Sequence, residues 1–403
     1  MTEQRTPIVL AFSGGLDTSF CVPWLTEQGF DVTTLFVDTG GVSTDEKTYI
    51  AERARELGAV DHRVGDVGDA VWHDVVLPML WGGQWYQAQY PLLCSDRYLI
   101  VKHALAHCDE LGTSQIAHGC TGMGNDQVRF DLTVATLGDY TIHAPVRDLQ
   151  QTVTNVRDHE MAWLAERGFG VRSKTSTYTI NENLLGVTIS GAEIDEFREP
   201  AEAAWQITAG RDQWPDDTLR TTLTFKHGEP TALDGEPCTG PALLATLNDR
   251  FGAYGAGRGL YTGDTSIGLK GRVAFEAPAL CALNTAHRAL EEACSTAAQN
   301  RFKPLAAREW VKLVYEGLFY EPLRIDIEQY LRSTQRTVSG DVTLTCSGGQ
   351  IQAAAIDSPH ILHNPNATYA QSADWSVDEA KGFIRLFGQS ASLWSKVNRE
   401  HIG

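Results

Sequence analysis

The sequence predicts an α/β fold with three parts: a doubly wound parallel-sheet nucleotide-binding domain (1–168), an α+β domain (169–370) and a C-terminal helical arm (371–403). In the first part, short apolar strand candidates alternate with helix candidates, which is typical of a parallel sheet covered by helices. In the second part, alternating strand patterns and longer helices indicate a mixed domain. A polar stretch then precedes one last helix.

The first domain is predicted from strands and helices that follow one another in regular alternation. Apolar runs mark the strands, and the helix at 45–58 is amphipathic and ends at a glycine, as helices often do. The strands are expected at 8–12, 31–40, 60–66, 113–120 and 141–148, and the helices at 20–29, 45–58, 97–112, 125–138 and 156–170.

The second domain shows a different rhythm. Period-two alternation predicts strands within 219–233 and at 272–277, and longer apolar periodicity predicts helices at 280–295 and 306–319. The segment 341–356 is expected to be a β-hairpin that turns at two glycines.

The final helix, expected at 377–400, carries more apolar surface than a solvated tail needs. It packs either on a neighbouring subunit or on its own subunit. The apolar residues are Phe383, Ile384, Leu386, Phe387, Leu393 and Trp394.

Composition excludes several classes of protein. The 403 residues carry a formal net charge of -18, which argues against nonspecific binding to nucleic acid, because that binding needs basic surface. No apolar run is long enough to span a membrane, and the N-terminus lacks the pattern of a secretory signal. The 8 cysteines form no CxxC pair and no zinc-like cluster, so free thiols in a cytoplasmic protein and no structural metal site are expected.

The strongest chemical signal is the segment Ser13–Ser19, which reads SGGLDTS between a strand and a helix. Unpaired backbone amides and the helix dipole favour an anion there, and two glycines let the backbone approach it closely. An ordinary tight turn is the alternative. The second SGG, at 347–349, lies between two strands with no helix after it, and is read as a plain turn.

The first motif, AFSGGLDTS, resembles the signature of the PP-loop ATP pyrophosphatases, which belong to the adenine nucleotide alpha hydrolase-like fold. The segment 118–130, HGCTGMGNDQVRF, narrows the match, since it resembles the signature of the argininosuccinate synthase family. Further matching pieces follow in order over essentially the whole chain: APVRD at 144–148, YTINENLLG at 178–186, RFKP at 301–304, LVYEGLFYEPLR at 313–324 and AKGFIRLFG at 380–388.

This resemblance implies an ATP-dependent ligase of arginine biosynthesis. In the family's reaction the ureido oxygen of citrulline attacks the α-phosphate of ATP and releases pyrophosphate. The α-amino group of aspartate then displaces AMP from the citrullyl-adenylate, which gives argininosuccinate. Mg²⁺ accompanies the ATP, and a homotetramer in the cytoplasm is implied, without nucleic acid or membrane as a partner.

The resemblance also implies roles for the nucleotide-site residues. Val37 would touch adenine and Gly119 the nucleotide, and Asp17 and Ser19 would belong, with Asp126, to the catalytic set. The phosphates would bind at Ala11, Phe12, Ser13, Gly14, Gly15, Leu16, Asp17, Thr18 and Ser19.

For the other substrates, the resemblance implies that Thr121, Asn125 and Asp126 hold aspartate, and that Asn125 and Arg129, on one face of a helix, also meet citrulline. Further substrate contacts are implied at Tyr90, at Ser95 or Arg97, and at Thr179 and Thr188. The alternatives are that Asn125 and Asp126 merely cap the helix, that Tyr90 is a core aromatic, and that the two threonines bind nothing.

The chain departs from the family pattern on the citrulline side. Gly263 stands where the family has a glutamate for the citrulline ammonium group, and Phe275 where it has a tyrosine. Asp264, or else Glu193 or Asp195, is a candidate to replace the lost carboxylate. A residue is missing after Tyr90, which leaves the register of Cys94 and Ser95 open.

Two hypotheses for the acceptor follow: free citrulline held by another acid, which we favour, and an acceptor without an ammonium group, such as an N-acylated citrulline or another ureido compound. Two other classes are weighed. An RNA-modifying PP-loop enzyme is disfavoured by the acidic charge, and a noncatalytic nucleotide-binding protein by the complete motifs.

Overall fold

The computed structural model describes residues 5–170 and 177–401. The chain separates into two compact units, residues 1–360 and 361–403, and each is described by itself.

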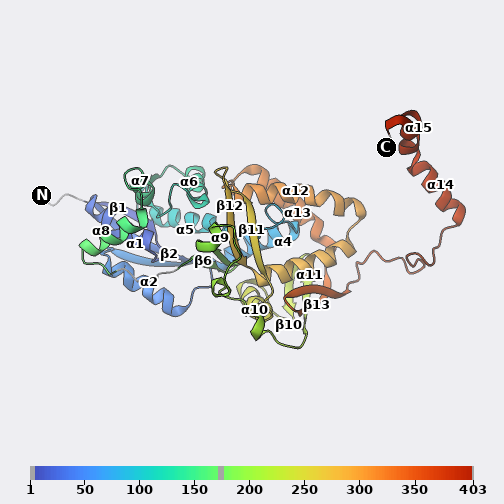
Figure 1. Cartoon of the computed structure of the whole chain (residues 1–403), viewed down its shortest axis with the longest axis horizontal. Helices are drawn as coiled ribbons and strands as arrows, with labels where there is room; N and C mark the ends of the chain where they lie inside the picture. The colour runs from blue at the N-terminus through green and yellow to red at the C-terminus, as the bar shows by residue number, and fades with distance from the viewer. Residues whose placement is uncertain (1–4, 171–176, 402–403) are drawn as a thin grey trace. The chain divides into compact units, whose positions relative to one another are not determined.

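The N-terminal part of the first unit is built on a five-stranded parallel sheet in the order β3-β2-β1-β4-β5. Neighbouring residues of β1 point to opposite faces. Ile8 and Leu10 pack with Phe20 of α1, whereas Val9 packs with Leu99 of α5, so helices cover both faces (Figure 1). The strands are β1 (Thr6–Ala11), β2 (Phe30–Asp38), β3 (Asp61–Asp66), β4 (Gln115–Ala117) and β5 (Thr141–His143).

The helices of this part follow the predicted alternation closely. They are α1 (Leu16–Glu27), α2 (Thr44–Glu56), α5 (Asp96–Glu110), α6 (Asn125–Leu137), α7 (Pro145–Leu149) and α8 (Val156–Glu166). The doubly wound parallel sheet predicted from the sequence is confirmed. The chain order of the strands reverses between β1 and β4, and in such sheets ligands bind at the carboxyl ends of the strands at this reversal.

Several predicted boundaries differ from the structure, and three of the differences have a clear local cause. The strand expected to reach residue 148 ends at His143, and Pro145 starts α7, because proline suits the first helical position. Helix α12 begins at Ala297 rather than at residue 306, since Thr296 and Gln299 form a capping box. The single final helix is two helices, separated at Gly388.

The rest of the first unit contains two antiparallel sheets with helices around them. One sheet has the order β11-β12-β7-β6 and the other β10-β9-β8-β13-β14. Their strands are β6 (Thr179–Asn183), β7 (Gly186–Ser190), β8 (Leu219–Lys226), β9 (Glu229–Leu233), β10 (Glu236–Pro237), β11 (Arg258–Asp264), β12 (Lys270–Glu276), β13 (Gly340–Ser347) and β14 (Gln350–Asp357). The predicted hairpin is confirmed, and Gly348 and Gly349 at its turn both have positive φ.

The long helices of this region share one core cluster with the sheets, and a smaller cluster contains Val187, Ile194 and Ala274. The α-helices are α3 (Gly68–Val71), α4 (Leu77–Gly82), α9 (Ala192–Asp195), α10 (Gly240–Gly252), α11 (Pro278–Cys294), α12 (Ala297–Tyr315) and α13 (Pro322–Thr334). Short π or 3-10 turns are η1 (Trp72–Val76), η2 (Glu202–Ala204), η3 (Arg211–Gln213) and η4 (Gln335–Thr337).

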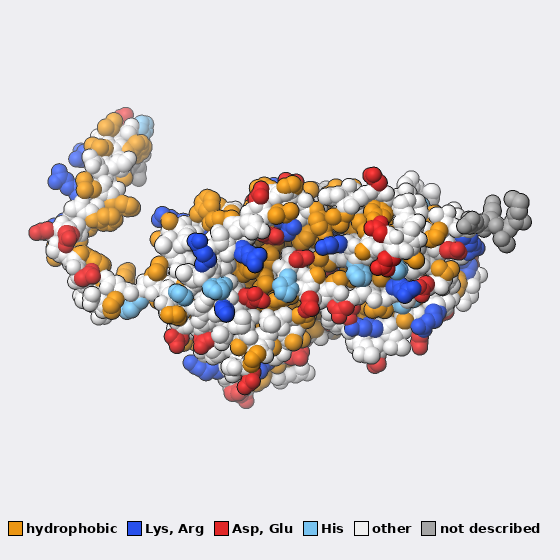
Figure 2. Space-filling view, turned by 180° about the vertical axis from the view of Figure 1, so that it is seen from behind, with side chains coloured by type: hydrophobic (Ala, Val, Ile, Leu, Met, Phe, Trp, Pro, Cys, Tyr) orange, Lys and Arg blue, Asp and Glu red, His pale blue; other side chains and the backbone are white. Residues whose placement is uncertain are grey.

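The second unit contains α14 (Val377–Phe387), α15 (Gln389–Val397) and the short turn η5 (Arg399–His401). Neither α14 nor α15 buries a side chain. Figure 2 shows hydrophobic side chains in orange along this arm. Among the described residues, no helix is both long and apolar enough to cross a membrane.

Candidate active site at the carboxyl edge of the N-terminal sheet

The loop between β1 and α1 has the geometry of an anion site. Gly14 adopts φ +74°, and a Cβ there would lie 3.0 Å from Ile50 Cγ1, so the position requires glycine. Gly15 precedes α1 with an extended backbone, and no side chain caps the helix. The first amides of α1 are therefore available to an anionic ligand.

Side chains of the same segment divide into two groups. Ser13 and Thr18 place their hydroxyls 3.3 Å apart at the accessible side of the loop. Ser19 is buried, and its hydroxyl donates to Gly14 O (3.4 Å) and accepts from Arg53 Nε (3.4 Å). Ser19 thus holds the loop in place from behind.

Among the other predicted loop residues, Ala11 and Phe12 are buried, which leaves chiefly their backbone to meet a ligand. Leu16 is half-buried, and Asp17 is exposed in the first turn of α1.

The structure brings Gly119 to this loop. A Cβ at Gly119 would lie 3.0 Å from Thr18 Cγ2 and 3.2 Å from Thr18 N, so the segment after β4 touches the first turn of α1. Val37, in contrast, packs its side chain into the core cluster that contains Ala11 and α5. Its side chain lies on the α5 face of the sheet, opposite α1 and α2.

His118 frames the segment after β4. Its Nδ1 accepts from Cys120 N (3.1 Å), so its Nε2 carries the proton and donates to Asp131 Oδ1 (2.9 Å). The second Asp131 oxygen accepts from Arg147 Nη1 (2.6 Å). The side chain of His118 is buried and positions the loop that carries Gly119.

A second cluster centres on Asp126 at the start of α6. Its carboxylate accepts from Arg97 Nε (3.1 Å) and Arg129 Nη1 (2.7 Å), and Arg97 also binds Asp96 (2.7 Å). Burial raises the pKa of Asp126, but the two guanidinium groups outweigh burial and lower it to about 2. Gly124 is the N-cap residue and no side chain caps α6, so Asn125 and Asp126 are not there merely as caps.

Tyr315, the last residue of α12, contacts both Asn125 and Arg129 of this cluster. Arg129 is buried, and its Nε and Nη2 donate to Tyr315 O at 3.0 and 2.9 Å. Asn125 Nδ2 donates to Tyr315 Oη (3.1 Å), and its Oδ1 accepts from Ser266 N (3.0 Å). The predicted shared face of Asn125 and Arg129 is confirmed, since both contact Tyr315. Three donors of Arg129 are bonded within the protein, so this side chain is fixed and holds the Asp126 carboxylate in place.

The remaining predicted contacts have different surroundings. Tyr90 is buried, its hydroxyl lies 3.0 Å from that of Thr188, and its ring meets Phe275 edge-on. Ser95 is fully buried, and its hydroxyl donates to Leu92 O (2.7 Å), which leaves it no surface to offer a ligand. Thr179 is exposed on β6.

Three further predicted residues are Arg97, which contacts Asp126, Thr188 on β7, and Thr121 in the loop before α6. Arg97 links Asp126 to Asn181 Oδ1 (3.4 Å), and Asn181 pairs with Thr188 across β6 and β7. Thr121 is half-buried in the loop before α6, and a Cβ at Gly124 would lie 3.8 Å from its Oγ1.

Gln87 occupies the space next to Gly263. A Cβ at Gly263 would collide with Gln87 Oε1, and Gln87 Nε2 donates to Asp264 Oδ2 (2.9 Å). Asp264 also forms an ion pair with Lys270 and is half exposed. The carboxylate expected to replace the missing glutamate is therefore already engaged.

The two other candidate acids are engaged as well. Glu193 accepts from the Tyr178 hydroxyl (2.7 Å) and from Ala201 N (2.8 Å), and Asp195 accepts from Gly191 N (3.0 Å).

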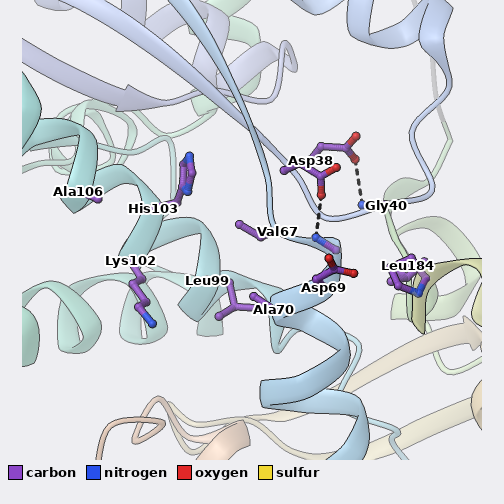
Figure 3. A pocket seen from close by; sticks show the side chains of 13 residues that line it. Asp38, Gly40, Val67, Asp69, Ala70, Leu99, Lys102, His103, Ala106 and Leu184 are labelled. Atoms are coloured by element: carbon purple, nitrogen blue, oxygen red, sulfur yellow. Dashed lines mark hydrogen bonds between the residues drawn. The ribbon is translucent and has the colours of Figure 1, made fainter. Parts of the chain in front are cut away.

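A separate cavity of about 750 Å³ lies at the carboxyl ends of β2 and β3, against α5. Figure 3 shows Asp38 and Asp69 on one side and Lys102 and His103 on the other. Asp38 is paired with Lys47 and accepts from Gly40 N (2.9 Å). No residue predicted for the active site lines this cavity.

Sequence reasoning missed several residues that contact the predicted site residues or their neighbours. Tyr86 stacks on Tyr315 at 3.6 Å, Tyr261 bonds Gln87 and Asp264, and Asn181 meets Arg97. No motif spacing marks them, because they come from segments far apart in the chain. All eight cysteines are free of disulfides, and the described residues contain no cluster of three or more His, Cys, Asp or Glu placed to hold a metal.

Comparison with known proteins gives consistent matches. The model of the Arginosuccinate synthase N-terminal HUP domain matches residues 7–169, and that of the Arginosuccinate synthase C-terminal domain matches residues 178–394. The argininosuccinate synthase of Xanthomonas campestris pv. campestris is 59% identical over 392 residues, which cover 97% of this chain and 99% of that protein.

Two further relatives carry the same name. The argininosuccinate synthase of Xylella fastidiosa is 57% identical over 97% of this chain and 98% of its own, and that of Bacillus cytotoxicus is 33% identical over 99% of both. A solved structure, a predicted subunit of tRNA methyltransferase from Methanocaldococcus jannaschii, covers 41% of this chain and 90% of its own at 15% identity with a TM-score of 0.28, too low to carry an argument.

Proposed function

The chain belongs to the argininosuccinate synthase family, and from this premise we propose that it joins citrulline to aspartate with ATP, releasing AMP and pyrophosphate. The observation that carries the proposal is the uncapped N-terminus of α1, which follows Gly14 and is contacted by Gly119. The Asp126 cluster lies at the start of α6, the helix that follows the neighbouring strand β4. An anion site and a set of polar side chains thus lie at the same edge of one parallel sheet, as a ligase of two substrates needs.

ATP fits the loop because its phosphates need backbone donors and close approach. The amides after Gly14 and the hydroxyls of Ser13 and Thr18 supply donors, and the buried pair of Ser19 and Arg53 keeps the loop in shape. Mg²⁺ would be carried chiefly by the triphosphate, since the described residues offer no cluster of three metal ligands. When bound, the ion neutralises phosphate charge.

The substrate-side residues would orient the two amino acids. The ureido oxygen attacks the α-phosphorus and pyrophosphate leaves, and then the aspartate nitrogen attacks the ureido carbon and AMP leaves. Asn125, Asp126 and Thr121 are proposed to hold aspartate, with Asp126 facing its ammonium group. Arg97 and Arg129 keep Asp126 ionised for this contact. Catalysis then consists mainly of positioning and charge stabilisation.

For the acceptor we propose free citrulline near Tyr90, Thr188 and Arg129. A second acceptor class, a ureido compound without a free ammonium group such as an N-acylated citrulline, is favoured by one observation: Asp264, Glu193 and Asp195 each already have partners. An ammonium group left without a carboxylate in a buried pocket costs several kcal/mol, of order 2–5.

The test is the release of AMP and pyrophosphate from MgATP and aspartate with either citrulline or N-acetylcitrulline. Turnover with citrulline supports the proposal and requires one of these acids to change partner. Turnover with N-acetylcitrulline alone would replace the proposed acceptor. No release with any acceptor would contradict the ligase and favour a noncatalytic nucleotide-binding protein.

We further propose a division of labour and an assembly. Residues 1–168 would bind the nucleotide, 169–370 would complete the substrate site, and the arm at 371–403 would reach a neighbouring subunit in a homotetramer. The unburied apolar side chains of α14 and α15 support the last point. The eight free cysteines support a cytoplasmic location, where thiols stay reduced.

A further inference from the structure

A buried carboxyl group lies directly behind the nucleotide loop. Helix α8 packs on α1, and Trp163 of α8 meets Phe20 of α1 edge-on with ring centroids 5.0 Å apart. Glu160 of α8 is 1% exposed. Neither of its carboxyl oxygens receives a hydrogen bond from an N–H or O–H donor within the described chain. An ionised carboxylate without donors is strongly disfavoured in such a place.

The group within hydrogen-bonding reach of Glu160 is another carboxyl, that of Asp17 in the first turn of α1. Two carboxylates can only accept, so a hydrogen bond between them requires a proton on one of the two. The other charged or titratable groups that act on the pair are Cys21 of α1, Cys120 after β4 and Arg157 of α8. Burial raises the pKa of Cys21 well above its usual range, so that thiol stays neutral.

We propose that Asp17 and Glu160 share one proton at neutral pH, and that Glu160 is a positioning residue that sets both the orientation and the charge of Asp17 at the nucleotide loop. The inference rests on the proposed binding of ATP there. Burial, and after it the negative charge of Asp17, together raise the pKa of Glu160 to about 8. The pair therefore carries one negative charge instead of two beside the triphosphate.

This charge state matters for an anionic ligand. Two ionised carboxylates behind the first turn of α1 would oppose the helix dipole and repel phosphate. Bound triphosphate in turn disfavours loss of the shared proton. Nucleotide binding should therefore take up a fraction of a proton at a pH slightly above the pKa of the pair, and none well below it.

The first experiment measures that proton. ATP is titrated calorimetrically into the full-length protein at about pH 8.5, in two buffers of different ionisation enthalpy. The wild type should take up a clear fraction of a proton for each ATP bound, and Glu160→Gln, which keeps the shape but cannot titrate, should take up almost none. The matched control is Glu166→Gln, an exposed glutamate of the same helix, which should behave as wild type. Equal uptake by wild type and Glu160→Gln would overturn the proposal.

A second experiment needs no nucleotide and separates this inference from the proposed function. Because the folded-state pKa of Glu160 is raised, its contribution to stability is full below the unfolded pKa of about 4.3 and is lost as pH rises through about 8. The free energy of unfolding of Glu160→Gln should therefore rise relative to wild type between about pH 5 and pH 9. Parallel curves would contradict the shared proton. If the two curves diverge as expected but the protein binds no ATP, the shared proton is supported and the proposed function is refuted.

Discussion

At the scale of single residues, the motif positions divide into those that are accessible at the loop surface and those that are buried and hold the others in place. Gly14, Ser13 and Thr18 form the open side of the loop, whereas Ser19 and Arg129 are buried and bonded within the protein. A motif therefore contains both accessible groups and the buried groups that support them, and only burial and hydrogen bonding tell them apart.

The two SGG segments provide a matched test of the loop. Gly14→Ala should raise the KM for ATP at least about tenfold and lower stability by about 1–3 kcal/mol, because its φ is positive and Ile50 crowds the added methyl group. Gly348→Ala, at φ +56° in an open turn, should lower stability in a similar way without changing the KM for ATP. Steady-state kinetics and urea unfolding of both variants decide the matter. An unchanged KM for ATP in Gly14→Ala would show that the loop does not bind the nucleotide.

The Asp126 cluster predicts a dependence of stability on pH. The folded-state pKa of Asp126 is lowered, so its stabilising contribution is present above the unfolded pKa of about 3.9 and is lost as pH falls toward about 2. The difference in unfolding free energy between wild type and Asp126→Asn should be constant near neutral pH and shrink below about pH 4. Since the side chain is 36% exposed, solvent screening reduces the size of the effect.

Asp378→Asn is the control for this measurement, because that side chain is 95% exposed and should show almost no difference from wild type at any pH. If the difference for Asp126→Asn stayed constant down to about pH 3, the ionised carboxylate would not be what stabilises the cluster.

At the scale of elements, a buried network of hydrogen bonds and one ion pair connects helices α4, α11 and α12. Lys303 of α12 forms an ion pair with Glu291 of α11 and donates to Trp81 O (2.7 Å) at the end of α4. Gln335 donates to Glu291 Oε1 (2.8 Å) and accepts from His287 (2.8 Å). Burial lowers the pKa of His287 to about 3, so this histidine is neutral in the network.

Lys303→Met should therefore destabilise the protein by about 3–5 kcal/mol, because it leaves the Glu291 carboxylate buried without its ion partner. Lys312→Met on the same helix removes an exposed pair and should cost less than about 1 kcal/mol. Chemical unfolding of both variants gives the comparison. The double variant Lys303→Met/Glu291→Leu should recover much of the loss, and a failure to recover would show that packing, and not the lone charge, causes it.

At the scale of the whole molecule, the arm carries a consequence for assembly. Phe383 and Phe387 stack with centroids 5.1 Å apart and are 63% and 81% exposed. An apolar face of this kind on a helix is typical of an interaction site.

If the arm joins subunits, Phe383→Ser/Phe387→Ser should shift the protein from a tetramer to smaller species in sedimentation velocity. Leu305→Ser, which removes an exposed apolar side chain of α12, should leave the tetramer unchanged. A tetramer that survives the double change would assign the interface to another surface, and a wild-type monomer would refute the proposed assembly.

The sequence by itself determined the family, the parallel sheet and the loop at 13–19, because these depend on local periodicity and on backbone features of adjacent residues. Tertiary structure alone revealed that Gln87 fills the space beside Gly263, that Tyr315 organises Asn125 and Arg129, and that Glu160 faces Asp17. These partners are separated by about 140 to 190 positions in the chain. Their contact follows from how helices and sheets pack, which no local pattern encodes.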